Sequence, residues 1–149
     1  MTMRFQNGFT VAETLIATAL LAFTVDAALA RISTQIEQTR IERAKDEITH
    51  IGAEIEVYRA RHHELPGSLT DLDSAVPLDP WAHPYEYVNF DAHGTVGQRT
   101  FEGLPINSDY DLYSRGADGR TDVNLRSETA HDDIVRARDG AYVGPASDF

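Results

Sequence analysis

The chain contains no cysteine, so none of its 149 residues can take part in a disulfide. A small domain without a disulfide needs another device to stabilise its loops. The chain is also short of cations, because 13 Lys and Arg stand against 24 Asp and Glu, a formal net charge of −11. Affinity for nucleic acid rests on clustered Lys and Arg, so this balance argues against nucleic acid as a partner.

One stretch near the N-terminus is almost free of charge. Residues 9–30 include 16 apolar side chains and only two acids, Glu13 and Asp26. A helix of this length, rising about 1.5 Å per residue, spans about 33 Å, which is enough to cross a hydrocarbon core of about 30 Å. The segment before it carries one cation, Arg4, and no acid. The sequence therefore predicts a membrane-spanning helix over residues 9–30, with the N-terminus in the cytoplasm and the rest of the chain outside it.

A secretory signal peptide is the alternative interpretation of the same run, with a cleavage site at Ala28-Leu29-Ala30. The run is longer than the roughly 7 to 15 residues of a signal core. A helical pattern also continues beyond it, since apolar residues recur every three to five positions at Ile32, Ile36, Ile41, Ala44, Ile48, Ile51, Ile55 and Tyr58. Residues 31–66 are therefore predicted to form the amphipathic half of the same helix, which Pro66 and Gly67 end.

The acid inside the apolar run belongs to a recognisable motif. The segment GFTVAETL at residues 8–15 resembles the prepilin processing site of type IV pilins and type II secretion pseudopilins. In that family a membrane peptidase cuts after the glycine, here Gly8, and methylates the new N-terminal phenylalanine, here Phe9. The resemblance implies that Glu13 pairs with the Phe9 amine of a neighbouring subunit. Such a pair would neutralise a carboxylate that costs roughly 2.5 to 3.5 kcal/mol at the centre of a membrane helix.

Three further segments match the same superfamily in the same order. YR at residues 58–59 with ELP at 64–66 resembles the family's helix exit. LDPWAHPYEY at 78–87 resembles a segment typical of the major pseudopilin, with Ala82 in place of its glycine. YDLYSRGADG at 110–119 resembles the strand that ends in Ser-x-Gly-Ala-Asp-Gly. The chain is thus most like the major pseudopilin of type II secretion, and the missing C-terminal disulfide, common in pilins, favours that choice.

These patterns predict an α+β, pilin-like fold, with a long N-terminal helix packed on a small antiparallel β-sheet. Residues 1–8 are predicted to be a leader peptide and residues 67–149 a small periplasmic domain. Within this domain we expect a short helix at 68–74 and strands at 85–90, 100–101 and 110–114. The tail at 136–149 is left open as docked or loose. Asp26 and Ala30 depart from the family, which usually has no acid at the first position and often a proline at the second.

Acidic residues crowd the last third of the chain: Asp109, Asp111, Asp118, Asp122, Glu128, Asp132, Asp133, Asp139 and Asp148. Calcium takes about six to eight oxygen ligands, and acidic loops suit it. An EF-hand is excluded, because a loop that starts at Asp118 has Val123 in place of its glycine and Thr129 in place of its final glutamate. From spacing alone, a solvated acidic loop is the alternative.

The resemblance adds a ligand set to this acidic region. It implies calcium held by Asp118, Asp132 and Asp133, with the carbonyl of Arg115 as a fourth candidate. The stretch between the two acidic elements lacks the glycines usual in the family's loop, and this departure bears on the geometry of the site.

The sequence indicates a structural protein, and we identify no catalytic residue in it. The predicted function is that of a subunit of a type II secretion pseudopilus, a single-pass precursor in the bacterial inner membrane that assembles into a periplasmic homopolymer. Its predicted partners are prepilin peptidase, minor pseudopilins, the inner-membrane assembly platform and, before assembly, membrane lipid. The alternatives are a type IV pilin for adhesion, motility or DNA uptake, a membrane-anchored binding module that does not polymerise, and a signal-anchored enzyme that uses the carboxylate loop.

Overall fold

The computed structural model describes residues 10–94 and 96–149, and for residues 21–30 and His93 it describes the backbone alone. The helices and strands, in chain order, are α1 (Val11–His62), β1 (Glu86–Asn89), α2 (Phe90–His93), β2 (Thr100–Phe101), β3 (Leu104–Pro105), β4 (Tyr110–Ser114), β5 (Ile134–Ala137) and β6 (Tyr142–Pro145). Short 3-10 turns lie at Leu69–Asp71, Glu128–Ala130, Arg138–Gly140 and Ala146–Asp148. The chain divides into two compact units, Met1–Gln38 and Thr39–Phe149, and each is described by itself.

The first unit contains the first part of α1. This helix is continuous through Ala30, as expected where no proline interrupts it. Its apolar side chains Leu15, Ile16 and Leu20 are 61–64% exposed. Across the residues that the structure describes, no helix is both long enough and apolar enough to cross a membrane. The predicted span at 9–30 lies partly outside the described residues, because it includes Phe9 and the side chains of 21–30, Asp26 among them.

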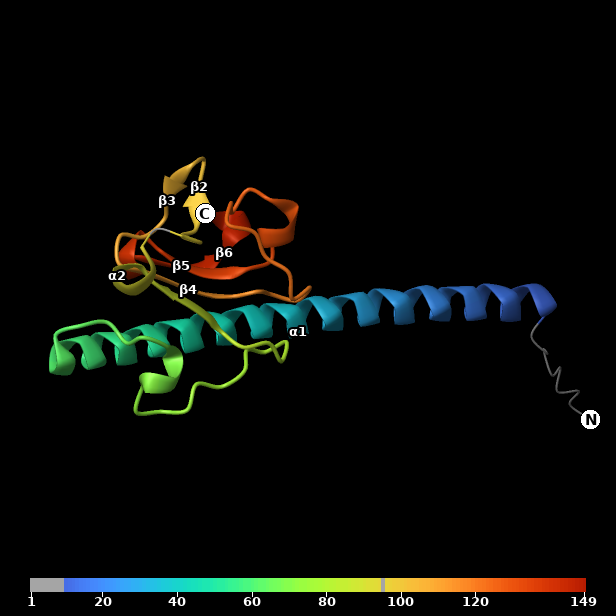
Figure 1. Cartoon of the computed structure of the whole chain (residues 1–149). Coiled ribbons are helices and arrows are strands. Elements are labelled where there is room, and N and C mark those ends of the chain that lie inside the picture. The colour runs from blue at the N-terminus through green and yellow to red at the C-terminus, as the bar shows by residue number, and fades with distance from the viewer. Residues whose placement is uncertain (1–9, 95) are drawn as a thin grey trace, which may run out of the picture. The chain divides into compact units, whose positions relative to one another are not determined.

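In the second unit, the later part of α1 packs on the sheet (Figure 1). Ala44, Ile48, Ile51 and Ile55 lie three or four positions apart on the buried side of the helix and are at most 2% exposed. Their partners on the sheet are Tyr110, Leu112 and Ile134. The amphipathic pattern is therefore the pattern of the core from Ala44 to Ile55, whereas Ile32 and Ile36, which belong to the same pattern, are 52% and 50% exposed. The helix ends at His62, four residues before the predicted end at 66.

The sheet has the strand order β1-β4-β5-β6, and all neighbouring strands are antiparallel. The strands predicted at 85–90 and 110–114 correspond to β1 and β4, and the antiparallel sheet is confirmed. The strand predicted at 100–101 is β2, which pairs with β3 in a separate two-stranded sheet. In place of the short helix predicted at 68–74 there is a 3-10 turn at Leu69–Asp71. The sequence analysis missed α2, β3, β5 and β6, and it left the tail open as docked or loose. All four residues of β5 are buried, so the strand lacks the alternation that marks a half-exposed strand.

The face of the sheet away from α1 carries a second core of Ile106, Leu125, Val135, Ala137 and Ala146. The β2–β3 hairpin and the C-terminal segment cover this face (Figure 1). The ring of Phe149 lies 5.3 Å from the rings of both Phe101 and Tyr142, so the tail is docked. The sheet is thus a middle layer between the helix and the hairpin.

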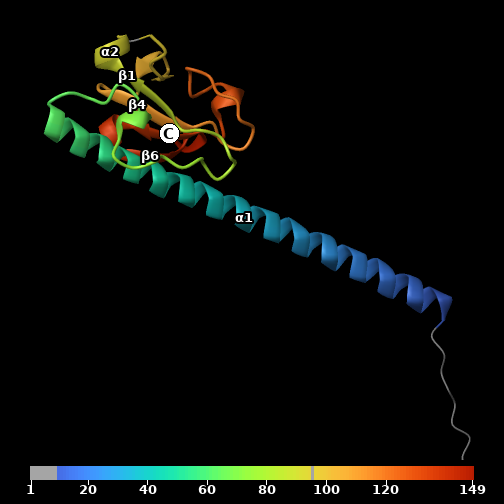
Figure 2. The same cartoon turned by 60° about the horizontal axis from the view of Figure 1, so that its bottom comes forward.

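Between α1 and β1 the chain doubles back alongside the helix (Figures 1 and 2). Two tyrosines of the motif at 78–87 hold this return. The Tyr85 hydroxyl donates to Glu47 of α1 at 2.6 Å, and the Tyr87 hydroxyl donates to the Pro66 carbonyl at 3.0 Å. The motif therefore has a structural role, which is to tie the loop and β1 to the later part of α1 and to the segment that follows it.

The contribution of the helix–sheet core to stability can be tested with one buried and one exposed isoleucine of α1. Ile55 is fully buried, whereas Ile36 on the same helix is 50% exposed. Ile55→Ala should reduce the free energy of unfolding by about 2 to 5 kcal/mol, since it leaves a cavity. Ile36→Ala should cost less than about 1 kcal/mol. Thermal unfolding of the full chain in detergent, followed by the fluorescence of the single tryptophan, checks this, and equal losses at the two positions would contradict it.

Candidate functional site

At the start of α1, Glu13 closes a hydrogen-bonded box with Thr10. The Glu13 Oε2 atom accepts from the backbone N–H of Thr10 at 2.8 Å and from its hydroxyl at 2.9 Å, while the Glu13 N–H donates to the Thr10 hydroxyl at 3.2 Å. This is a capping box, which satisfies backbone donors that have no partner inside the helix. The sequence analysis missed this role, although the Thr-x-x-Glu spacing signals it. Gly8 and Phe9, the other two residues of the predicted processing and assembly site, lie outside the described residues.

Asp79 joins two of the sequence motifs. It is buried, and its Oδ1 atom accepts the N–H groups of Trp81 and His83 at 3.0 and 2.7 Å. Its Oδ2 atom accepts the hydroxyl of Ser114 at the end of β4. The His83 Nδ1 atom lies 3.2 Å from the Gly116 carbonyl oxygen. The loop before β1 and the turn after β4 are therefore held as one piece.

The turn after β4 brings the two acidic elements together. Gly116 has a φ of +62°, and a Cβ at this position would lie 2.2 Å from the carbonyl oxygen of Asp132. Two residues after Gly116, the N–H of Asp118 donates to Asp132 Oδ2 at 2.9 Å. The Arg115 side chain points elsewhere and pairs with Glu86. Asp118 and Asp132 thus lie close together, as the ligand prediction required, but they are connected through a backbone donor.

Asp133 differs from these two acids because its side chain is fully buried. Its Oδ2 atom accepts the Thr121 hydroxyl at 2.6 Å and is paired with Arg99 Nη2. Burial raises the pKa of Asp133 to about 6, against the opposite effects of the Arg99 charge and the Thr121 hydrogen bond. Among the described residues, no group of three or more acidic or histidine side chains could hold a metal ion. The three predicted carboxylates do not form such a group, and the ion pair of the Arg115 side chain does not test its carbonyl, so calcium stays a prediction of the resemblance.

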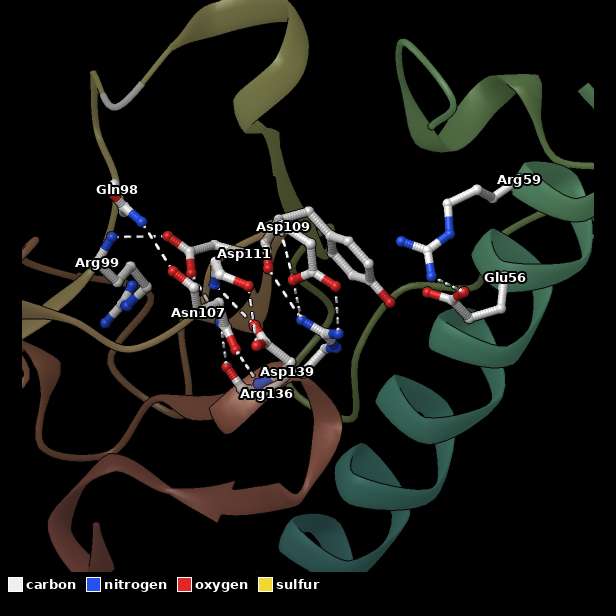
Figure 3. Close-up of polar contacts among 11 residues, drawn as sticks. Glu56, Arg59, Gln98, Arg99, Asn107, Asp109, Asp111, Arg136 and Asp139 are labelled. Carbon is white, nitrogen blue, oxygen red and sulfur yellow. Dashed lines mark hydrogen bonds and ion pairs between the residues drawn. The ribbon is translucent and has the colours of Figure 1, made fainter. Parts of the chain in front are cut away.

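A buried polar cluster continues from Arg99 along the same side of the sheet (Figure 3). The Arg99 N–H donates to Asp111 Oδ2 at 2.6 Å, and the Asn107 amide donates to Asp111 Oδ1 at 2.9 Å. The Gln98 amide donates to the Asn107 carbonyl at 2.8 Å. Burial raises the pKa of Asp111, although these donors oppose the shift. The cluster joins the segment before β2, the segment before β4 and β4 itself, and no local sequence signal indicated Arg99 or Asn107 as its members.

Arg136 of β5 makes a second internal ion pair (Figure 3). Its two terminal nitrogens donate to the two carboxylate oxygens of Asp109, each at 2.9 Å, and its guanidinium lies 3.9 Å from the centre of the Tyr110 ring. Burial tends to raise the pKa of Asp109, but the hydrogen bonds from Arg136 and from the Tyr110 N–H hold it below its usual range. Among the described residues, Arg99 and Arg136 thus tie the buried Asp133 and the partly buried Asp109 to the sheet of a chain without disulfides.

The described residues form a long helix, the later part of which packs on one face of a four-stranded antiparallel sheet. The α+β fold class predicted from the sequence is confirmed. The chain is similar to the type II secretion system core protein G of Pseudomonas aeruginosa, with 26% identity over 141 residues, covering 80% of this chain and 89% of that protein. No family model and no solved structure matches the chain. The similarity confirms the resemblance to type II secretion pseudopilins and, among them, to the major pseudopilin.

Gly116 and Gly103 offer a matched pair of substitutions. Both have positive φ, but a Cβ at Gly103 has no described atom within 4 Å. Alanine at either position pays the left-handed penalty of roughly 1 to 2 kcal/mol. Gly116→Ala must also displace the backbone of Asp132, so its loss of unfolding free energy should reach about 3 kcal/mol or more. Thermal unfolding of the two variants checks this difference. If Gly116→Ala loses no more unfolding free energy than Gly103→Ala, the close approach of Asp132 to residue 116 does not contribute to stability.

Proposed function

We propose that this chain is a structural subunit of a type II secretion pseudopilus. The observation that carries the proposal is its similarity to core protein G over 80% of this chain and 89% of that relative, which extends well beyond one short motif. The pilin-like architecture of the described residues agrees with it. The relative is a protein of a type II secretion system, which favours the pseudopilus over the type IV pilus. No residue is assigned a catalytic role.

The exposed apolar side chains of α1 support a helix that is covered by other molecules. Leu15, Ile16 and Leu20 are mostly exposed in the single chain, and apolar surface of this kind indicates contact with lipid or protein. In the proposal, residues 9–30 lie in the inner membrane in the precursor. After cleavage behind Gly8 by prepilin peptidase, they pack against the same helix of neighbouring subunits. The inner-membrane assembly platform and minor pseudopilins would then be partners in building the periplasmic filament.

Glu13 has a place in this assembly that is compatible with its capping bonds. Both bonds to Thr10 end on Oε2, and the side chain is exposed. The Oε1 atom can therefore accept from the Phe9 amine of a neighbouring subunit. One carboxylate would then start its own helix and set the register of the next subunit.

Processing provides the direct test of the proposal. Mass spectrometry of the chain purified from cells with a type II secretion system should find a mature protein that begins at N-methylated Phe9. Gly8→Val, which replaces the residue before the cut, should leave the precursor intact. A wild-type chain that retains Met1, or one cut after Ala30, would reject a pseudopilin precursor.

The two roles of Glu13 can be separated by substitution. Glutamine keeps the capping box but removes the charge, whereas alanine removes both. If the charge sets the register, Glu13→Gln should reduce the yield of filaments by at least about tenfold, because the amine of the neighbouring subunit is left buried and unpaired. Glu42→Gln is the control, since Glu42 forms only an exposed pair with Lys45. Normal filaments from Glu13→Gln would leave the helix cap as the role of this residue.

A further inference from the structure

The carboxylate of Asp133 has no access to solvent, and its charge is met by a guanidinium. Arg99 is 2% exposed, and its Nη2 atom is paired with Asp133 Oδ2. The Arg99 Nη1 atom donates to the Thr121 hydroxyl at 2.6 Å, and this hydroxyl donates to the same Asp133 oxygen at 2.6 Å. The three side chains form a closed triangle that joins segments as much as 34 residues apart.

Arg99 is also fixed by contacts that do not involve the acidic loop. Its guanidinium lies 4.0 Å from the centre of the Tyr113 ring, on β4. Its backbone N–H donates to Asp111, and its carbonyl accepts the N–H of Ile106 at 3.1 Å. The guanidinium therefore packs on the sheet, and the backbone of Arg99 is bonded to β4 and to the residue after β3. The loop at 116–133 contacts the guanidinium through Thr121 and Asp133.

A bound divalent ion would have to share Asp133 with this guanidinium. Two cations on one buried carboxylate repel each other, and this repulsion is strong where water is excluded. The other acids of the loop are partly used by the backbone, because Asp132 accepts the N–H of Asp118, and Asp118 accepts the N–H of Arg120 at 2.7 Å. Each of these contacts provides locally what a metal ion provides in an acidic loop, namely a positive partner for a carboxylate oxygen.

We propose that Arg99 is the resident cation of the acidic loop, and that its guanidinium takes the place of calcium in holding residues 116–133 on the sheet. Thr121 completes the contact because it bridges the guanidinium and the carboxylate. The pair is a positioning device for the loop, and it is independent of whether the chain forms a filament. The disagreement between the predicted calcium ligands and their contacts then has a physical cause, since Arg99 meets the charge of Asp133 from inside the fold through Oδ2. The Oδ1 atom of Asp133 is buried and accepts no hydrogen bond from the described residues.

The first experiment measures the response of the full chain to calcium. The wild-type protein in detergent is melted in calcium chloride at millimolar concentration and in chelator, with the fluorescence of the single tryptophan as the signal. A ligand that binds only the folded state raises the melting temperature. The proposal expects the two melting temperatures to agree within about 1 °C, and isothermal titration with calcium chloride to give no saturable heat. A melting temperature that rises specifically with calcium would overturn it.

The second experiment removes the guanidinium. Arg99→Gln leaves Asp133 buried without a charge partner and should lower the melting temperature by on the order of 10 °C. Arg126→Gln is the matched control, because Arg126 pairs with Glu102 at 3.1 Å where both side chains are about 60% exposed. It should shift the melting temperature by less than about 2 °C. Equal shifts in the two variants would overturn the proposal.

A third variant separates the charge of Arg99 from its shape. Arg99→Lys keeps a cation but loses the planar fork that reaches Thr121 and Asp133 together. It should melt between the wild type and Arg99→Gln, and a lysine variant no more stable than the glutamine variant would show that the charge is not what holds the loop. If Arg99→Gln does not fold, the calcium response of the wild type and the position of Arg99→Lys relative to the wild type still decide the outcome.

Discussion

The ion pair between Arg99 and Asp133 is the buried charged contact that connects the acidic loop to the outer layer of the sheet, beside the backbone bonds of Thr100 to residues 123 and 125. It joins the segment that leads into β2 to the residue that precedes β5, and Thr121 bridges the two. Desolvating two charges is costly, so such a pair is weak evidence of net stabilisation, but removing one partner typically costs about 3 to 5 kcal/mol. In a chain without cysteine, the pair fixes where a long loop runs, as a disulfide or a metal ion does in other small domains.

The helix α1 contributes apolar side chains to two different surfaces, one buried and one exposed. Between Ala44 and Ile55 its apolar face is buried against the sheet, and this face is part of the fold of the single chain. At Leu15, Ile16 and Leu20 the apolar side chains remain exposed, so they are available to lipid or to other copies of the helix. The proposed role as a filament subunit uses both surfaces, one to fold the single chain and one to pack against the helices of neighbouring subunits.

The features that the sequence analysis predicted are those with a local signal. The helical period marked the core face of α1, and the aromatic and branched residues marked β1 and β4. Strand β5 escaped because both of its faces are buried, and it includes Arg136, a residue type that is rarely buried without a partner. The role of Thr10 as a cap was missed although its spacing to Glu13 was readable. The partner of Asp133 had no local signal at all, since Arg99 lies 34 residues away.

The sequence by itself determined the α+β class, the long helix, the capping and motif residues at its start, and the resemblance to pseudopilins, because these depend on short-range spacing and on residue type. Only the tertiary structure decided which of the acidic residues are buried and which groups they contact. Asp132 and Asp133 are neighbours in the chain, yet one meets the N–H of Asp118 and the other is buried on Arg99. Asp132 lies in a turn and Asp133 directly precedes β5, so their adjacency in the sequence does not show which of them is buried. Which of the two carboxylates is buried, and which cation it contacts, depends on how distant segments pack against the sheet.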